Sequence, residues 1–110
     1  MSTKWLVRQT EDARQDRTRI VRWTIQHFGT RQAAIYTETI ALALEALASG
    51  PDTIGARQRG DLGYGIHTLH VARNGRKGRH FIVFRSGGHQ TIDVLRLLHD
   101  SMDLSHHLPA

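Results

Sequence analysis

The feature that most constrains the fold is a change in the spacing of apolar residues between the two halves of the chain. In residues 10–49 they recur three or four positions apart, which is the spacing of one face of a helix. In residues 64–98 they alternate or form short runs between glycine-containing turns, which is typical of strands. Helices followed by strands predict an α+β domain, in which an N-terminal antiparallel helical hairpin packs on a small antiparallel β-sheet. The helical stripe comprises Ile20, Val21, Thr24, Ile25 and Phe28, and then Ala33, Tyr36, Ile40, Ala43, Leu44 and Leu47.

Capping residues mark the ends of the predicted helices. Thr10 is suited to cap the first helix, and two acidic residues follow it in the first turn, where the helix dipole favours anions. Gly29 ends this helix, since glycine adopts the left-handed cap conformation freely, and Thr30 caps the next helix. The Gly-Pro pair at 50–51 stops the second helix. Because the connection between them is so short, the two helices are expected to form an antiparallel hairpin over residues 10–49.

The second half predicts a β-meander over residues 64–98. Asn74-Gly75 and Gly87-Gly88 supply its turns, and the short connections make its strands antiparallel. The run FIVF at 81–84 is apolar on both faces, which suits a central strand covered on both sides. The predicted strands are residues 64–73, 80–86 and 91–98, with a short opening strand at residues 4–8.

The helices can cover only one face of this sheet. The other face carries Phe81 and Val83, or the residues that alternate with them, depending on the register. The C-terminal tail, residues 99–110, is one candidate cover for this face and is expected to be a short helical turn or irregular. A partner chain is the other candidate. Residues 1–110 are expected to form a single domain.

Charge and composition indicate which kinds of partner the chain could bind and in which compartment it would work. The formal net charge is +5 and the sequence pI is about 10.7, which favours anionic partners. Four cations, Arg73, Arg76, Lys77 and Arg79, fall at one predicted hairpin tip, where a flexible solvated turn is favoured over a dedicated RNA contact. The chain has no cysteine, no signal-peptide apolar core and no apolar run long enough to span a bilayer, so a cytoplasmic protein without membrane contact is expected.

No pattern of residues predicts a catalytic, metal or cofactor site. His67 and His70 lie three positions apart on a predicted strand, so they point to opposite faces and cannot share a metal. No strand–turn–helix elbow frames a serine near a histidine, which argues against a hydrolase nucleophile. The glycines of GRKGR lie between two strands and do not open a helix, so they do not form a phosphate loop. We therefore expect no cofactor, no metal ion and no catalytic residue.

Two stretches of the second half resemble a known toxin superfamily. GIHTLHVARNGRKGRHFIVFR, followed by IDVLRLLHDSMDLSHHL, is similar to the RelE/ParE superfamily of type II toxin–antitoxin systems, and its ending fits the ParE branch best. The first half agrees, because IVRWTIQHFGTRQAAIYTETI resembles the helical hairpin of that family. The resemblance implies the RelE/ParE-like fold and a ParD-like antitoxin as partner. It implies one of two activities, which are inhibition of DNA gyrase in the ParE branch and ribosome-dependent cleavage of messenger RNA in the RelE branch.

The residues around the end of the sheet favour gyrase as the target. RNA cleavage through the 2′-hydroxyl needs a proton acceptor and cations around the phosphate. The ribonuclease relatives place an arginine just after the start of the middle strand, where this chain has Phe81. Their basic C-terminal cluster and tyrosine are replaced here by HDSMD and a tail without tyrosine. The sequence therefore predicts a gyrase inhibitor that acts by binding. The alternatives are a ribosome-dependent endoribonuclease that uses Arg85, Arg96 and His99, and an inactive toxin that only binds its antitoxin.

The expected target contacts lie on the exposed face of the sheet and on the tail. A structural alternative is that Arg85 and Arg96 simply pair with Asp93 or Asp103. The antitoxin is expected to cross the helical hairpin, and an antitoxin strand added to an open sheet edge is a second mode of binding. The target-binding candidates are Arg85, Arg96, His99, Met102 and Asp103, and the antitoxin-interface candidates are Trp5, Trp23, Phe28 and Tyr36.

Overall fold

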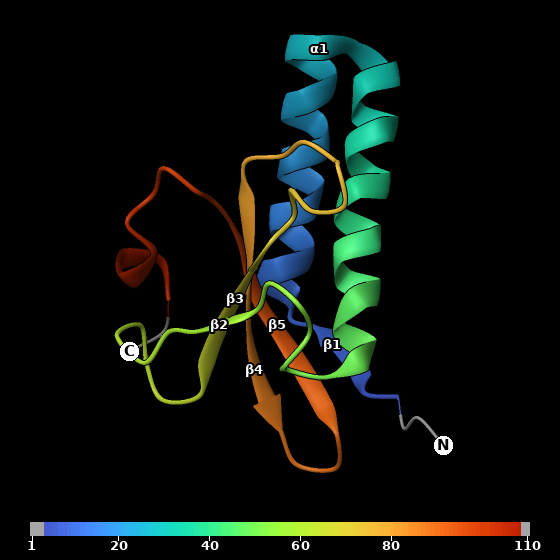
Figure 1. Cartoon of the computed structure of the whole chain (residues 1–110). Helices are drawn as coiled ribbons and strands as arrows, with labels where there is room; N and C mark the ends of the chain where they lie inside the picture. The colour runs from blue at the N-terminus through green and yellow to red at the C-terminus, as the bar shows by residue number, and fades with distance from the viewer. Residues whose placement is uncertain (1–3, 109–110) are drawn as a thin grey trace.

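The computed structural model describes residues 4–108, which form one layer of helix and one five-stranded mixed sheet (Figure 1). The strand order in the sheet is β1-β5-β4-β3-β2. No helix in the described part of the chain combines the length and the apolar character needed to cross a membrane. The elements are β1 (Leu6–Gln9), α1 (Glu11–Ala46), η1 (Leu47–Ser49), β2 (Arg57–Gln58), β3 (Ile66–His70), β4 (His80–Gly87), β5 (Thr91–His99) and η2 (Leu104–His107).

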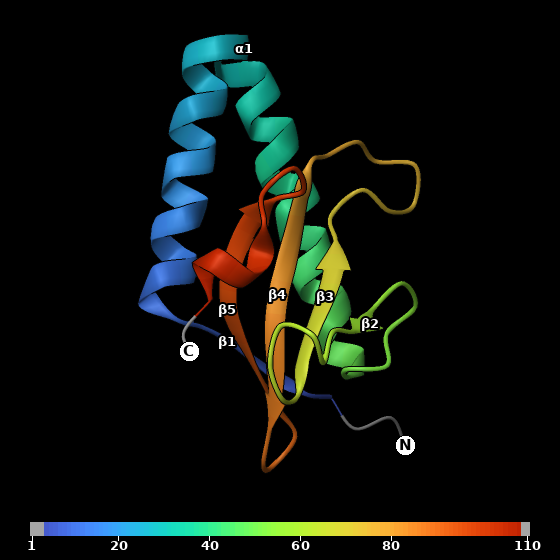
Figure 2. The same cartoon turned by 90° about the vertical axis from the view of Figure 1, so that its left-hand side faces the viewer.

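The helical half departs from the prediction in one respect. Thr10 caps α1 as predicted, because its hydroxyl accepts the backbone N–H of Ala13 at 3.1 Å. The sequence predicted a hairpin of two separate helices, with Thr30 as the cap of the second. The structure instead has a single helix, because the departure from helical backbone is confined to Gly29, with φ 90° and ψ 171°. At that residue α1 folds back, so that its two arms lie side by side (Figures 1 and 2).

The predicted strands are present, and two pairings were not foreseen. Strands β3, β4 and β5 form the expected antiparallel meander. The opening strand β1 adds to it in parallel, with Leu6 opposite Thr91 and Gln9 opposite Val94 of β5. The two-residue strand β2 pairs with β3 and lies outside all the predicted strands. β2 is too short to show an alternation of apolar and polar residues. The β1–β5 pairing joins segments that are far apart in the sequence, so no local pattern predicts it.

The two faces of the sheet have different covers. Ile82 and Phe84 face α1 and are fully buried in the main core. Val83 and Phe81 lie on the opposite face, where the tail packs on them through Leu104 (Figure 2). Of the two covers considered for this face, the C-terminal tail is the one observed. The second cluster comprises Ile66, Val83, Leu98 and Leu104, flanked by Leu62, Phe81, Leu95 and Leu108.

The basic segment between β3 and β4 is not the free, solvated tip that was predicted. Arg76 Nε donates to the Thr39 hydroxyl at 2.9 Å, and its Nη2 donates to the carbonyl of Ile35 at 3.3 Å. Arg73 Nη2 donates to the carbonyl of Ile54 at 3.1 Å. The hydrogen bonds of Arg76 therefore hold the segment against the second arm of α1 (Figure 1).

The turns of the meander use left-handed residues, partly at other positions than predicted. Asn74 and Gly75 have φ of 54° and 79°, as an Asn-Gly turn requires. In the β4–β5 turn the left-handed residues are His89 and Gln90, with φ of 57° and 55°, and not the preceding Gly-Gly pair. The Gly-Gly pair correctly predicted the position of this turn, but the left-handed residues are the two that follow it.

Candidate functional site

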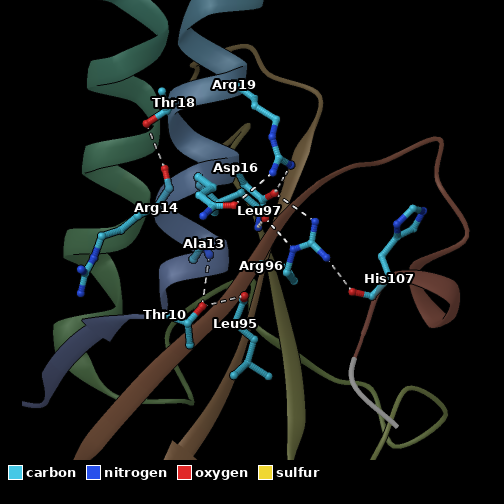
Figure 3. Close-up of polar contacts among 11 residues, drawn as sticks. Thr10, Ala13, Arg14, Asp16, Thr18, Arg19, Leu95, Arg96, Leu97 and His107 are labelled. Carbon is cyan, nitrogen blue, oxygen red and sulfur yellow. Dashed lines mark hydrogen bonds and ion pairs between the residues drawn. The ribbon is translucent and has the colours of Figure 1, made fainter.

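Arg96, predicted to face a target, is instead enclosed between α1 and the tail (Figure 3). Its Nε donates to Asp16 Oδ2 at 2.7 Å, and its Nη2 donates to Asp16 Oδ1 at 3.0 Å. Asp16 is buried and also accepts the backbone N–H of Leu97 at 3.0 Å. The Nη1 of Arg96 donates to the carbonyl of His107 at 2.8 Å. The hydrogen bonds to Asp16 raise the pKa of Arg96, and this one guanidinium ties together α1, β5 and the tail.

Arg85 is the candidate that remains open to a partner. It is exposed on the face away from α1, and it lies opposite Asp93 across the β4–β5 pair. Asp93 pairs with Arg8, whose Nε donates to its Oδ1 at 2.9 Å. The expected pairing of Arg85 or Arg96 with Asp93 or Asp103 is therefore wrong for Arg96, and it is not among the ion pairs of the described residues for Arg85.

Two further candidates lie at the start of the tail. The Met102 side chain is exposed. Asp103 caps η2, because its Oδ1 accepts both the N–H and the hydroxyl of Ser105, at 3.2 and 2.7 Å. These hydrogen bonds lower the pKa of Asp103. Met102 is thus available to a partner, whereas Asp103 already has a local structural role.

His99 belongs to a cluster of titratable side chains where β3, β4 and β5 meet the tail. Asp100 is the centre of this corner cluster: Arg79 Nε donates to its Oδ1 at 2.9 Å, and His70 Nε2 donates to its Oδ2 at 3.0 Å. The hydrogen bond from Arg79, and then that from His70, hold the pKa of Asp100 well below its usual range. His99 Nδ1 accepts the hydroxyl of Ser101 at 2.7 Å. One ring nitrogen of His99 is therefore already hydrogen-bonded inside the fold.

Tyr36 and His80 form the part of the corner cluster that faces α1. The Tyr36 hydroxyl lies 2.6 Å from His80 Nδ1 and accepts the backbone N–H of Arg79 at 3.0 Å. The rings of His80 and His99 meet edge to face, with centroids 5.3 Å apart. Burial, helped by His99, lowers the pKa of His80 to about 4, and burial raises the pKa of Tyr36. Tyr36, expected at a partner interface, has its hydroxyl committed to the sheet.

Of the remaining aromatic candidates, Trp5 is half-buried, whereas Trp23 and Phe28 are exposed. Trp5 packs against the main core, and its indole lies so close to Gly50 that a Cβ there would be 2.9 Å from Nε1. Trp23 is 53% exposed and Phe28 is 62% exposed, near the break in α1. Trp23 stacks on His27 with ring centroids 4.2 Å apart. Trp23 and Phe28 therefore form an exposed aromatic pair, whereas Trp5 is a core residue.

The first arm of α1 surrounds these aromatics with positive charge. Residues 17–37 include four arginines and no carboxylate. A shallow hollow on this arm combines apolar side chains with two of the arginines. Its lining residues are Arg17, Thr18, Val21, Arg22, Ile25 and Gln26. Such a surface is suited to an acidic partner with an apolar face.

The structure thus brings together only part of the predicted site. His99 bonds to Ser101, next to Asp100, whereas Arg96 bonds to Asp16, and sequence reasoning missed the roles of both carboxylates. Asp16 offered one signal, because it is a carboxylate beside the arginines of the first arm. His67 and His70 do lie on opposite faces, against Phe84 and Phe81 respectively. Between residues 4 and 108 no three acidic or histidine side chains are placed to hold a metal ion.

The fold is similar to a solved chain described as the chromosomal ParDE TA system from P. aeruginosa, with a TM-score of 0.72 and 20% identity over 89% of this chain and 98% of that one. It is also similar to the toxin–antitoxin complex RelBE2 from Mycobacterium tuberculosis, with a TM-score of 0.56 and 24% identity over 90% and 94%. A search of curated proteins finds no match. A family model described as the ParE toxin of the type II toxin–antitoxin system parDE matches residues 7–104, and the chain therefore belongs to the ParE toxin family.

Proposed function

We propose that this toxin inhibits DNA gyrase by binding and is neutralised by a ParD-like antitoxin in the cytoplasm. The observation that carries the proposal is the enclosure of Arg96 by Asp16 and the carbonyl of His107. Phosphate cleavage requires cations that face the scissile group. Here Arg96 faces a buried carboxylate, and Arg79 faces Asp100. A surface that acts by docking has no such requirement.

The target contact is proposed to centre on Arg85 and Met102. Both side chains are exposed, and they belong to β4 and to the start of the tail. Arg85 supplies a charge without an ion-pair partner among the described residues, and Met102 supplies a flexible apolar contact. His99 and Asp103 are proposed to position the tail through their bonds to Ser101 and Ser105.

The antitoxin is proposed to bind along α1 through the exposed aromatic pair Trp23 and Phe28. Large aromatic side chains commonly anchor protein interfaces. The absence of carboxylates over residues 17–37 favours an acidic antitoxin segment and disfavours a second copy of this basic chain. Trp5 and Tyr36 are not proposed as anchors, because both pack inside the fold.

A gyrase assay tests the proposal. Purified toxin added to supercoiling reactions is expected to inhibit them and to trap cleaved DNA, and added antitoxin is expected to reverse both effects. Arg85→Glu is expected to weaken inhibition by about tenfold, since reversing an interface charge makes it repulsive. Arg57→Glu is the matched control, because Arg57 is another exposed arginine, on the edge strand β2. A folded wild-type toxin that leaves gyrase active would refute the proposal.

Ribosome-dependent RNA cleavage is the second candidate function. It is favoured by the corner cluster, where three imidazoles and the Tyr36 hydroxyl gather as potential proton donors and acceptors. Toeprinting on translating ribosomes would then show codon-linked cuts that His99→Ala weakens. Activity in neither assay, with antitoxin binding retained, would identify a toxin that has lost its activity.

A further inference from the structure

We propose that Tyr36 and His80 form a proton-operated latch, which holds the basic 73–79 segment against α1 at neutral pH and releases it in acid. The latch is local to one corner of the fold. It joins the second arm of α1, which carries Tyr36, to the start of β4, which carries His80. It is independent of which target the toxin attacks.

The close approach at this corner is built into the sequence. Gly78 lies against the Tyr36 ring, and a Cβ at that position would be 2.5 Å from Val71 Cγ2 and 2.9 Å from Tyr36 Cε1. Only glycine therefore lets the segment reach Tyr36 without displacing a neighbour. The segment then continues directly into Arg79, whose N–H donates to the Tyr36 hydroxyl.

The direction of the hydrogen bonds fixes the protonation state of His80. The Tyr36 oxygen already accepts the N–H of Arg79 at 3.0 Å, so its own proton is directed to His80 Nδ1 at 2.6 Å. Nδ1 must then be an acceptor, and His80 is the neutral tautomer with its proton on Nε2. A second proton on Nδ1 would meet the Tyr36 hydroxyl proton. The phenol would have to turn that proton out of the plane of its ring, and the contact would weaken.

The surroundings of His80 oppose its positive charge. His80 is half-buried under α1. The His99 ring of β5 packs against it edge to face, and His70 of β3 lies within the same cluster. Asp100 and the more distant Asp16 act in the opposite sense, but Asp100 is occupied by Arg79 and His70. The net result is a pKa of about 4 for His80 in the closed latch, against an ordinary value of 6.5.

Opening the latch leaves the basic segment with weak contacts. Arg76 still reaches the Thr39 hydroxyl through a part-buried hydrogen bond, and it reaches the carbonyl of Ile35 through an exposed one. Its ion pair with Glu38 is 3.7 Å long, and Glu38 is exposed. Exposed contacts of this kind stabilise little on their own. Release of the segment would let Arg73, Arg76 and Lys77 meet an anionic partner, while Arg79 stays paired with Asp100.

Hydrogen exchange of the full-length protein at pH 7.5 and pH 5, corrected for intrinsic rates, tests the latch. The opening constant for amides in residues 71–80 is expected to rise by about 30-fold, because the open form binds its proton at the ordinary pKa and the closed form at about 4. Amides in the centre of β5 should change much less. A uniform loss of protection through the whole sheet would overturn the proposal.

His80→Asn is the decisive variant, because its side-chain oxygen can accept from Tyr36 near the position of Nδ1 but cannot titrate. It should abolish the acid-induced opening. His89→Asn is the matched control, since His89 is exposed, lies in the β4–β5 turn and has a φ of 57° that asparagine tolerates. It should open like the wild type. If His80→Asn does not fold, proton NMR of the wild type decides: a His80 ring that titrates near pH 6.5 refutes the latch, and a midpoint near 4 that is shared by the 71–80 amides supports it.

Discussion

Asp16 and Arg96 lie 80 positions apart in the sequence and are joined by two hydrogen bonds, of 2.7 and 3.0 Å. Asp16 sits in the second turn of α1, and Arg96 lies beyond the point where β1 stops pairing with β5. The short length of β1 leaves this part of β5 open to the helix. The pair therefore replaces a missing stretch of strand pairing, and it also anchors the tail through His107.

Truncation of either member of this pair should destabilise the fold strongly. Asp16→Ala is expected to lower the free energy of unfolding by about 3–5 kcal/mol, because it leaves Arg96 and the Leu97 N–H without their acceptor. The double variant Asp16→Leu with Arg96→Met should lose less stability than either Asp16→Ala or Arg96→Ala. Urea denaturation measures all three. Asp61→Asn, at an exposed pair with Arg59, is the control and should change little. Additive losses in the double variant would contradict a coupled pair.

Gly78 should not tolerate a side chain. Gly78→Ala places a methyl group 2.5 Å from Val71 and 2.9 Å from Tyr36, so the segment must move away from α1. We expect a loss of about 1–3 kcal/mol, as for other overpacked sites, measured by thermal unfolding. Gly88→Ala is the matched control, because no atom lies within 4 Å of its added Cβ. Equal stability of the two variants would show that the 73–79 segment is not pinned.

The two tryptophans should separate stability from binding. Trp5→Ala is expected to cost about 2 kcal/mol or more, since the indole packs on the core beside Gly50. Trp23→Ala should leave the melting temperature nearly unchanged, because Trp23 is 53% exposed, and should weaken antitoxin binding by about tenfold or more. Calorimetry of unfolding and of antitoxin titration gives the two readouts. Full antitoxin affinity in Trp23→Ala would remove it from the interface.

The Asp100 carboxylate should make stability depend on pH below the neutral range. Its folded pKa is lowered, so its contribution is complete above the unfolded value of 3.8 and is lost as the pH falls through the lower folded value. Asp100→Asn should therefore be less stable than the wild type by a constant amount at pH 5–8. The gap should narrow below about pH 4. Asp52→Asn, an exposed loop carboxylate, should follow the wild type throughout. A gap that is as wide at pH 2 as at pH 6 would argue against ionisation as the cause.

Sequence reasoning recovered the parts of this fold that depend on local signals. Thr10 as helix cap, Gly29 as the point of reversal and the Asn74-Gly75 turn each have a conformational cause within a few residues. The α+β class followed from the same periodicities. What escaped prediction depends on distant partners: the parallel β1–β5 pairing and the short β2.

The candidate site was predicted less well for the same reason. Arginine and histidine were recognised as residues able to meet a partner, but their availability depends on what else reaches them. Arg96 is occupied by Asp16 and Arg79 by Asp100, across 80 and 21 positions. Among residues 4–108 no carboxylate pairs with Arg85, which stays available. Tyr36 looked like one residue of a helical stripe, and only the fold shows that it meets His80 across 44 positions.

The parallel pairing of β1 with β5 has a consequence for synthesis of the toxin. β1 is the first strand in the order of the chain, yet its partner β5 is the last. The sheet cannot close until β5 has left the ribosome, and contacts of such long range form slowly. The residues of β1 therefore stay without their partner strand during synthesis until β5 has been made.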